Sequence, residues 1–302
     1  MLKPDEASWS NTVNEEQSRL YREVPHHVFG QIALNAGLLR AYQQLDTAFL
    51  KLAADLKAQE YQFSSFIKAE YLRKLDYLHS FPQHATFPQV LCCDDHNYHQ
   101  FRKGEIVSSN DRINVTEMDL PEAILTPAAC YHFYIHFQNS AFTRSQVFTT
   151  KNTCYRNETE YTPLERQWSF SMREIVCIGH EVHVKKFVDD MTTRLSALFH
   201  KLPFDLEWKV ATDPFFNPSN NPKHLMQKLQ PSKYEIVFDN RLAIGSSNFH
   251  RSYFGETFNI TIDNGYVYSA CIAFGIERWL AAFMSHFGPN CDNWPMHLME
   301  HI

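Results

Sequence analysis

The chain has 302 residues, of which 44% are hydrophobic and 14% aromatic, and its formal net charge is −6. This length and composition allow a sizeable core and exclude a disordered or low-complexity chain. The acidic balance, with no visible basic stripe, counts against a large nucleic acid as partner, because phosphate neutralisation supplies much of that affinity.

The beginning of the chain is polar and mixed in charge, and we interpret residues 1–34 as a loosely ordered lead-in segment. It lacks the apolar run of a signal peptide. No apolar stretch of the chain is long enough to span a membrane, so we expect a cytoplasmic protein. The seven Cys residues are odd in number and widely scattered. This favours reduced thiols or isolated ligands over a disulfide framework.

Helical spacing of apolar residues begins near residue 36 and continues to residue 56. Residues 62–82 predict a short strand followed by a helix that stops near a proline, and residues 85–93 have the character of a strand. The segment "LTPAACYHFYIHFQN", residues 125–139, leaves two interpretations open. Its Thr-Pro pair suits a helix start, whereas its aromatic run suits a strand.

The second half of the chain is richer in predicted strands. A pair of strands in residues 154–176 leads into a helix, and residues 211–233 read as a helical insertion because prolines and asparagines interrupt regular structure there. Three more strands, residues 234–238, 242–250 and 257–263, are predicted before a closing helix over residues 266–287. This order predicts an α+β fold, an antiparallel sheet flanked by helices, in one domain over residues 35–302.

Charged residues stand in the predicted strand pair at positions where apolar residues are expected. Strand alternation places Arg156 and Glu158 on one face of the first strand, and Glu174 beside Met172 on the apolar face of the second. A buried carboxylate must be paired, hydrogen-bonded or metal-bound. The stretch alone leaves open a structural ion pair between Glu174 and Arg156, or a functional site.

The predicted closing helix carries Cys271, Gly275 and Arg278 at a spacing that places them on one helix face. A thiol and a guanidinium on either side of a glycine suit a ligand site. A small core cysteine and a solvated arginine explain the same spacing, and the spacing alone favours this explanation.

At these residues the sequence resembles a known family. "CYRNE" with "RQWSFSMREIV" resembles motif 2 of class II aminoacyl-tRNA synthetases, and "FGIERWL" resembles their motif 3. Residues 45–67 stand in the place of motif 1, the dimer-forming element, although Ser64 and Ser65 replace its expected proline. The more specific resemblance is to amino acid:[carrier protein] ligases, relatives of the zinc-dependent seryl-tRNA synthetases without a long tRNA-binding coiled coil.

The resemblance implies a zinc ion, one per subunit, bound by Cys130, Glu174 and Cys271. Their spacing alone predicts no metal site. Two thiolates and one carboxylate leave a fourth zinc position open, which in this family takes the amino group of the substrate. Glu174 and Asn248 are the residues assigned to the amino acid.

The resemblance also implies binding of ATP with Mg²⁺. Arg156 and Arg278 are expected to be catalytic, the first by bridging the α-phosphate and the substrate carboxylate, the second by pairing with the γ-phosphate. The full set assigned to ATP is Arg156, Glu158, Arg166, Gln167, Lys233, Leu242, Ala243, Ile244, Gly245 and Arg278.

The implied activity is activation of a small amino acid, glycine or alanine, with ATP and its transfer to the phosphopantetheine thiol of an acyl carrier protein. A homodimer is expected, with neither tRNA nor a membrane as partner. A basic helix with Lys223 and Lys228 suits an acidic carrier protein, or is an ordinary solvated helix. Two other functions remain as alternatives: a seryl-type enzyme that charges tRNA, and a non-catalytic amino acid sensor.

Overall fold

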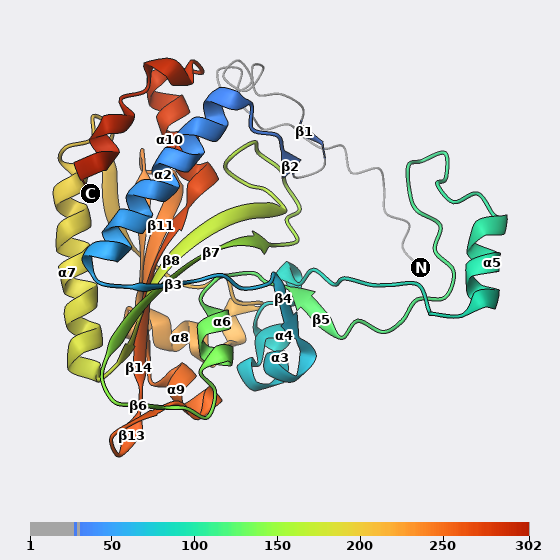
Figure 1. Ribbon diagram of the computed structural model, residues 1–302, viewed down its shortest axis with the longest axis horizontal. Helices are drawn as coiled ribbons and strands as arrows, with labels where there is room; N and C mark the ends of the chain where they lie inside the picture. Colours follow the sequence, from blue (N-terminus) through green and yellow to red (C-terminus); the bar gives the residue numbers. More distant parts are fainter. Residues whose placement is uncertain (1–26, 29–30, 302) are drawn as a thin grey trace.

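The computed structural model describes residues 27–28 and 31–301, and their centre is a seven-stranded sheet in the order β3-β7-β8-β14-β11-β10-β9 (Figure 1). Neighbouring strands are antiparallel, except that β3 and β7 are parallel. The expected α+β fold is confirmed. The strands are β3 (Gln59–Tyr61), β7 (Gln146–Tyr155), β8 (Ser169–Gly179), β9 (Leu206–Ala211), β10 (Lys233–Phe238), β11 (Leu242–Arg251) and β14 (Tyr268–Gly275).

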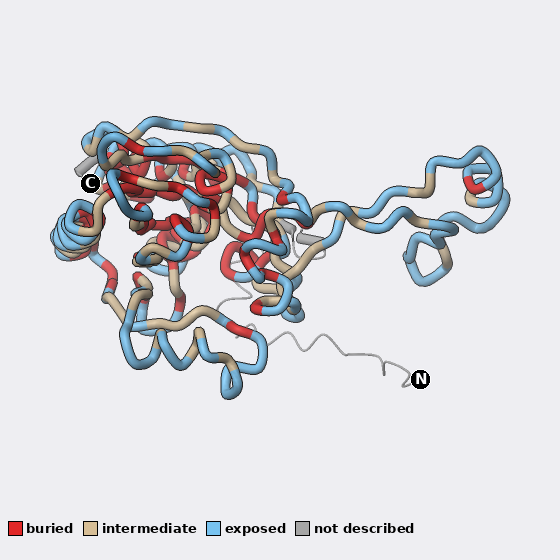
Figure 2. The backbone as a smooth tube through the Cα atoms, turned by 90° about the horizontal axis from the view of Figure 1, so that it is seen from below, coloured by how far each residue is buried: buried red, intermediate tan, exposed pale blue. Residues whose placement is uncertain are grey.

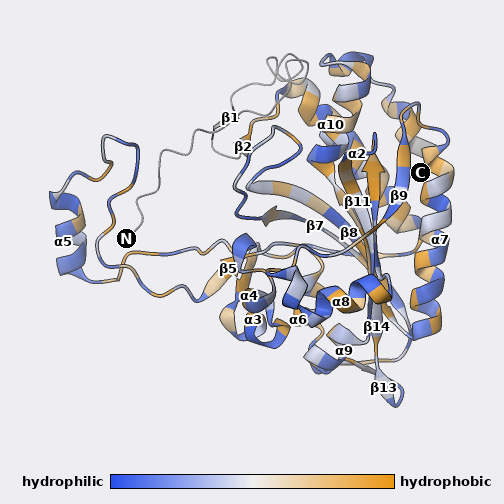
Figure 3. Cartoon of the chain, turned by 180° about the vertical axis from the view of Figure 1, so that it is seen from behind, coloured by the Kyte–Doolittle hydropathy of each residue, from blue (hydrophilic) through white to orange (hydrophobic). Residues whose placement is uncertain are grey.

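Three long helices cover one face of the sheet: α2 (Ala36–Asp55), α7 (Glu181–Phe199) and α10 (Ile276–Phe287). Asn35 caps α2, its side chain accepting a hydrogen bond from the Leu38 amide at 2.9 Å. Hydrophilic and hydrophobic residues alternate along α7 (Figure 3), so the helix buries only one side. We call the core between these helices and the sheet the helix-side core.

Short helices cover the other face: α3 (Ala69–Leu75), α4 (Tyr77–Ser80), α6 (Tyr131–His136), α8 (Pro222–Leu229) and α9 (Tyr253–Phe258). Aromatic rings fill the space between them and the sheet, and Tyr134 stacks on Phe254 with ring centroids 3.9 Å apart. Alternation along the strands divides the side chains between the two faces. On β8, Ile175 enters the helix-side core, whereas Val176 enters this second core.

The remaining elements are short or lie outside the main body. Residues 85–122 form an arm that extends away from the sheet and is mostly exposed (Figure 2). The remaining elements are β1 (His27–Val28), β2 (Gln31–Ile32), β4 (Phe66–Lys68), η1 (Pro82–His84), α5 (Asp95–Lys103), β5 (Ala123–Leu125), β6 (Ala141–Phe142), η2 (Pro218–Asn220), β12 (Thr261–Ile262), β13 (Gly265–Tyr266), η3 (Cys291–Asn293) and η4 (Met296–His301).

Within residues 27–28 and 31–301, no helix combines the length and apolarity needed to cross a bilayer.

The segment predicted as an insertion, residues 211–233, connects the paired strands β9 and β10 and contains η2 and α8. Several contacts tie it to the rest of the chain. Gln83 Nε2 donates to the Pro214 carbonyl at 2.6 Å, and Lys223 Nζ lies 3.1 Å from Asp76 Oδ2. Most of the lead-in, residues 1–34, lies outside the described residues, so its predicted loose order stays a prediction.

The closing helix predicted over residues 266–287 is wrong in its first half. Residues Tyr268–Gly275 form strand β14, and helix α10 begins only at Ile276. The strand is buried on both faces, so its apolar run has no alternation that distinguishes it from a buried helix. The prediction that Cys271, Gly275 and Arg278 share one helix face is therefore also wrong.

Other local predictions need correction as well. Residues 85–93 contain only an isolated bridge between Leu91 and Met118, and the strand predicted over residues 257–263 is reduced to the two residues of β12. Strand β7 ends at Tyr155, so Arg156 and Glu158 lie in a loop and not on the predicted strand face. The ambiguous segment after residue 125 forms helix α6, which begins after Cys130 and not at the Thr-Pro pair.

Strand β8 carries two adjacent charged residues that point to opposite faces, Arg173 and Glu174. The Arg173 guanidinium is almost fully buried and is held by α2 and β3: its Nε lies 2.6 Å from Asp46 Oδ1, and its Nη1 lies 2.9 Å from Glu60 Oε1. The proposed ion pair between Glu174 and Arg156 is not formed. Arg173 is instead the arginine that has a structural role.

Asp46→Ala is expected to lower the free energy of unfolding by about 3 kcal/mol, because it leaves a buried guanidinium without its main partner. Burial raises the pKa of Asp46, but hydrogen bonds from Arg173 and Lys151 hold it below the ordinary value of 3.8. The stabilisation is therefore present at neutral pH and is lost as pH falls through that lowered pKa. Urea denaturation measures both effects. Asp292→Ala, which removes the exposed partner of Arg40, is the control and leaves stability nearly unchanged.

Candidate active site

The three predicted metal ligands converge from distant parts of the chain. Cys130 precedes α6, Glu174 lies in β8 and Cys271 in β14, and one candidate ligand atom from each lies within 4.8 Å of the others. All three side chains are buried. Glu174 Oε1 accepts hydrogen bonds from the backbone amides of Ala129 at 2.7 Å and Cys130 at 3.0 Å, which fixes the carboxylate at the start of α6.

The chemistry of this donor set fits a divalent cation. Among the described residues, no lysine or arginine pairs with Glu174, although its carboxylate is only 1% exposed. Contact with the Cys271 thiol, burial and the neighbouring Glu174 raise the pKa of Cys130 well above its ordinary value. A bound cation would reverse this effect, because it stabilises the deprotonated thiol. Two thiolates and a carboxylate favour zinc over magnesium or calcium.

A cavity of about 500 Å³ opens over the cluster of Cys130, Glu174 and Cys271, and all three residues line it. A second cavity of about 110 Å³ adjoins it, and Arg156 and Lys233 line both. The smaller cavity contains most of the residues assigned to ATP. Its lining includes Arg156, Glu158, Gln167, Lys233, Ala243, Ile244, Gly245 and Arg278.

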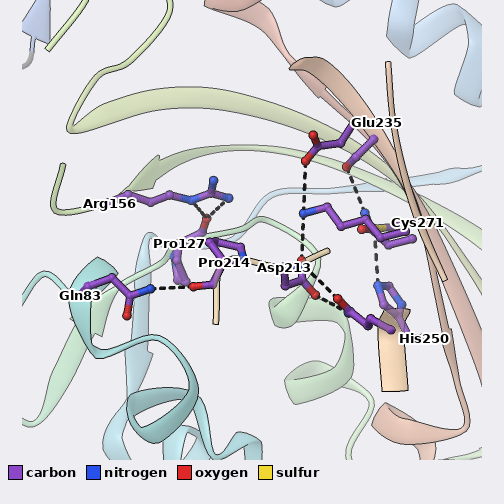
Figure 4. A network of polar contacts seen from close by, with 12 residues as sticks. Gln83, Pro127, Arg156, Asp213, Pro214, Glu235, His250 and Cys271 are labelled. Atoms are coloured by element: carbon purple, nitrogen blue, oxygen red, sulfur yellow. Dashed lines mark hydrogen bonds and ion pairs between the residues drawn. The ribbon is translucent and has the colours of Figure 1, made fainter. Parts of the chain in front are cut away.

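Arg156 stands between the two cavities and makes no ion pair with any described residue. Its Nε and Nη2 donate to the Pro127 carbonyl at 3.2 and 3.1 Å (Figure 4), and its guanidinium lies 5.1 Å from the centre of the Phe170 ring. These contacts orient the guanidinium without neutralising it. A cation placed in this way suits an anionic ligand that extends across both cavities.

Arg278, at the start of α10, has a similar environment. Its Nε donates to the Glu165 carbonyl at 2.7 Å and its Nη1 to the Ala243 carbonyl at 2.8 Å, and it forms no ion pair among the described residues. Burial lowers the pKa of Arg278 to about 10, so the group remains charged at neutral pH. The smaller cavity therefore has a second cation without a carboxylate partner.

Three other residues assigned to ATP differ in their placement. Arg166 does not line the smaller cavity, but its Nη1 lies 3.2 Å from Oε2 of Glu158, which does. The buried Gln167 lines the cavity and leaves its Oε1 without a hydrogen-bond partner. Lys233 Nζ lies 2.9 Å from Asp213 Oδ1 and 3.4 Å from Glu235 Oε1 (Figure 4), so it is already paired.

The backbone of β11 reaches the smaller cavity through residues 243–245, whereas Leu242 packs into the helix-side core. A Cβ atom at Gly245 would lie 2.8 Å from the Ala273 carbonyl, so glycine is required for the close packing of β11 on β14.

Asn248, assigned to the amino acid, lines the larger cavity. Its Nδ2 donates to Cys271 Sγ at 3.4 Å and to Ser246 Oγ at 3.0 Å. The sequence interpretation missed His250, two residues further along the same strand face, whose pKa burial lowers to about 4. Strand alternation from Asn248 was the available signal, since it places His250 on the same face.

Two arginines without ion partners beside a buried Cys-Glu-Cys cluster, on an antiparallel sheet, define the kind of site found in a class of nucleotide-using ligases. A family model described as the tRNA synthetase class II core domain (G, H, P, S and T) matches residues 115–287, which include all of these groups. The chain belongs to this class II synthetase core family.

Two kinds of curated protein are similar to the chain. Amino acid--[acyl-carrier-protein] ligase 1 of Bradyrhizobium diazoefficiens is 32% identical over 188 residues, which cover 60% of this chain and 57% of that protein. A Type-2 serine--tRNA ligase of Methanococcus maripaludis is 28% identical over 279 residues, covering 86% of this chain and 53% of that one. The chain spans little more than half the length of these relatives.

The solved structures that are similar to this chain support the fold. The M. kandleri SerRS, crystallised in complex with A. aeolicus tRNASec, superimposes with a TM-score of 0.79 at 18% identity, covering 96% of this chain and 60% of that chain. A prolyl-tRNA synthetase from Giardia lamblia, crystallised with prolyl-adenylate, gives a TM-score of 0.64 at 12% identity, covering 90% and 52%.

Proposed function

We propose that this chain activates a small amino acid, glycine or alanine, with ATP and Mg²⁺ and transfers it to the phosphopantetheine thiol of a carrier protein. The observation that supports this most directly is the adjacency of the two cavities, with the Cys130, Glu174 and Cys271 cluster in one and Arg278 in the other. Arg156 lines both. The similarity to the Bradyrhizobium ligase supports a carrier protein as the second substrate.

The proposed reaction has two steps. An oxygen of the amino acid carboxylate attacks the α-phosphorus of ATP, an aminoacyl-adenylate forms and pyrophosphate leaves. The carrier thiol then attacks the carbonyl carbon, loses its proton and displaces AMP, which gives a thioester. Arg156 and Arg278 offset the negative charge that develops on the phosphate oxygens. Zinc, when bound by the cluster, would supply an open position for a neutral amine.

Helix α8 is the proposed docking element for the carrier protein. It has no buried residue and exposes Leu225, Met226 and Leu229 beside Lys228. Lys223 is less available, because its Nζ is held between Asp76 and Ser80. An exposed apolar strip next to a lysine suits an acidic, partly apolar protein surface.

The resemblance places the dimer contact of the homodimer at residues 45–67, and we propose that exposed apolar side chains of the arm, residues 85–122, add to it. A second copy of this chain that covers them would bring much apolar surface out of water. Sedimentation equilibrium tests this, and a monomer at every concentration would contradict it. The exposed apolar residues are Phe87, Val90, Tyr98, Ile106, Val107, Ile113, Val115 and Leu120.

Amino acid-dependent ATP–pyrophosphate exchange, followed by transfer of labelled amino acid, tests the proposed function. We expect exchange with glycine or alanine and label on the holo carrier protein, with none on the apo carrier that lacks the arm. Lys228→Glu is expected to slow transfer about tenfold at limiting carrier and leave exchange intact, because it repels an acidic partner. Lys201→Glu, at an exposed site after α7, is the matched control.

Charging of tRNA is the second candidate, favoured by the match to Type-2 serine--tRNA ligases over 86% of the chain. The net charge of −6 counts against it. Exchange with serine and label on tRNA alone would replace the carrier proposal. The absence of exchange with any amino acid would favour a sensor.

A further inference from the structure

Two side-chain nitrogens of strand β11 face the sulfur of Cys271. Asn248 Nδ2 lies 3.4 Å from Cys271 Sγ, and His250 Nε2 lies 3.7 Å from it (Figure 4 shows the histidine contact). Asn248 is the direct cross-strand partner of Cys271, and His250 lies two residues further, where the pairing register of β11 with β14 shifts. One strand therefore brings both nitrogens to this candidate metal ligand.

The surroundings of the other ring nitrogen allow His250 to act as a donor. His250 Nδ1 lies 3.1 Å from the Tyr134 hydroxyl and 3.2 Å from Ser269 Oγ. A neutral imidazole carries one N–H, and hydroxyl groups can donate to the nitrogen without it. Two hydroxyls at Nδ1 thus suit the tautomer with its proton on Nε2, directed at Cys271.

A thiolate ligand makes this tautomer necessary. Cys271 binds a metal only after it loses its proton, and its sulfur then only accepts hydrogen bonds. A ring without a proton on Nε2 would direct the lone pair of that nitrogen at the negatively charged sulfur, which is unfavourable. At Cys130, by contrast, no side-chain N–H donor lies against the sulfur among the described residues. The two thiols of the cluster are therefore held differently.

We propose that His250 is a positioning residue of the metal site, and that its Nε2–H, together with the amide of Asn248, holds the Cys271 thiolate toward Cys130 and Glu174. The role is that of the groups that orient metal ligands from outside the coordination sphere. This inference rests on the metal site of the proposed function. Its test is the affinity for zinc itself, which is measured without any substrate.

Zinc affinity is measured on the full chain by competition with a chromophoric chelator. His250→Phe, which keeps a ring of similar size without N–H groups, is expected to weaken zinc binding about 10–100-fold. His250→Gln, which keeps a side-chain N–H, is expected to restore most of the affinity. Cobalt(II) provides a spectroscopic signature, since the thiolate-to-metal absorption band should shift in His250→Phe and return in His250→Gln.

His132→Phe is the matched control. This histidine is buried, and its ring stacks with centroids 5.4 Å apart on Phe63, which packs against the second core. It should bind zinc like the wild type, with thermal melts reporting any loss of packing. Equal zinc affinity and an unshifted cobalt band in His250→Phe would overturn the inference while the metal site stands. Absence of zinc binding by the wild type would overturn both.

Discussion

Cys130→Ala is expected to stop zinc binding and, with it, amino acid-dependent pyrophosphate exchange. The substitution leaves Glu174 and Cys271 as the remaining members of the cluster, and two ligands do not hold zinc against chelators. We expect exchange to fall by more than about 100-fold, beyond the effect of losing a group outside the coordination sphere. Metal content after dialysis and the exchange rate are measured on the same preparation.

Cys177→Ala is the matched control for this substitution. Cys177 is buried on the same strand as Glu174, but its side chain belongs to the helix-side core. Its loss should cost about 1–2 kcal/mol of stability and leave zinc binding and exchange unchanged. A Cys130→Ala chain that retains full exchange with no metal bound would contradict the metal assignment.

Arg156→Lys is expected to reduce exchange about 100–1000-fold, because the flexible ammonium keeps the charge but loses the planar, fixed set of donors. The loss should fall on kcat more than on KM for ATP, since the interaction is strongest when charge develops at the α-phosphorus. Arg156 suits this test better than Arg278. Its guanidinium donates to one carbonyl, that of Pro127, whereas Arg278 joins the carbonyls of Glu165 and Ala243, so its removal would also disturb packing.

Arg144→Lys is the control, because Arg144 is exposed on the loop before β7. It should exchange pyrophosphate at the wild-type rate. If Arg156→Lys does the same, the group does not contact the reacting phosphate. The cation-π contact with Phe170 and the bonds to Pro127 would then be its whole role.

The sequence predicted the fold class and the long helices well, because their amphipathic patterns are local signals. It failed where burial on both faces removes alternation, as in Tyr268–Gly275. It also failed at Arg156 and Glu158, which alternation placed on a strand, because the strand ends at Tyr155. The first error concerns the type of element and the second concerns where an element ends.

The convergence of Cys130, Glu174 and Cys271 could not be derived from their spacing, because it depends on the pairing of β8 with β14 and on the start of α6. Only the resemblance to a known family suggested these residues together. Arg173 shows the reverse difficulty. Its charge was visible in the sequence, but its partner Asp46 lies on a helix far away in the chain.

The opposed charges of strand β8 also determine its alignment within the sheet. A shift of one residue would move every side chain to the other face. It would bring the Arg173 guanidinium into the cavity and press the Glu174 carboxylate against the apolar helices, with neither charge compensated. Each face of the strand therefore makes the misaligned form less stable, independently of the other face. Arg173, which is held by helix α2, and Glu174, which faces the cavity, therefore also oppose misaligned pairing of the central strand during folding.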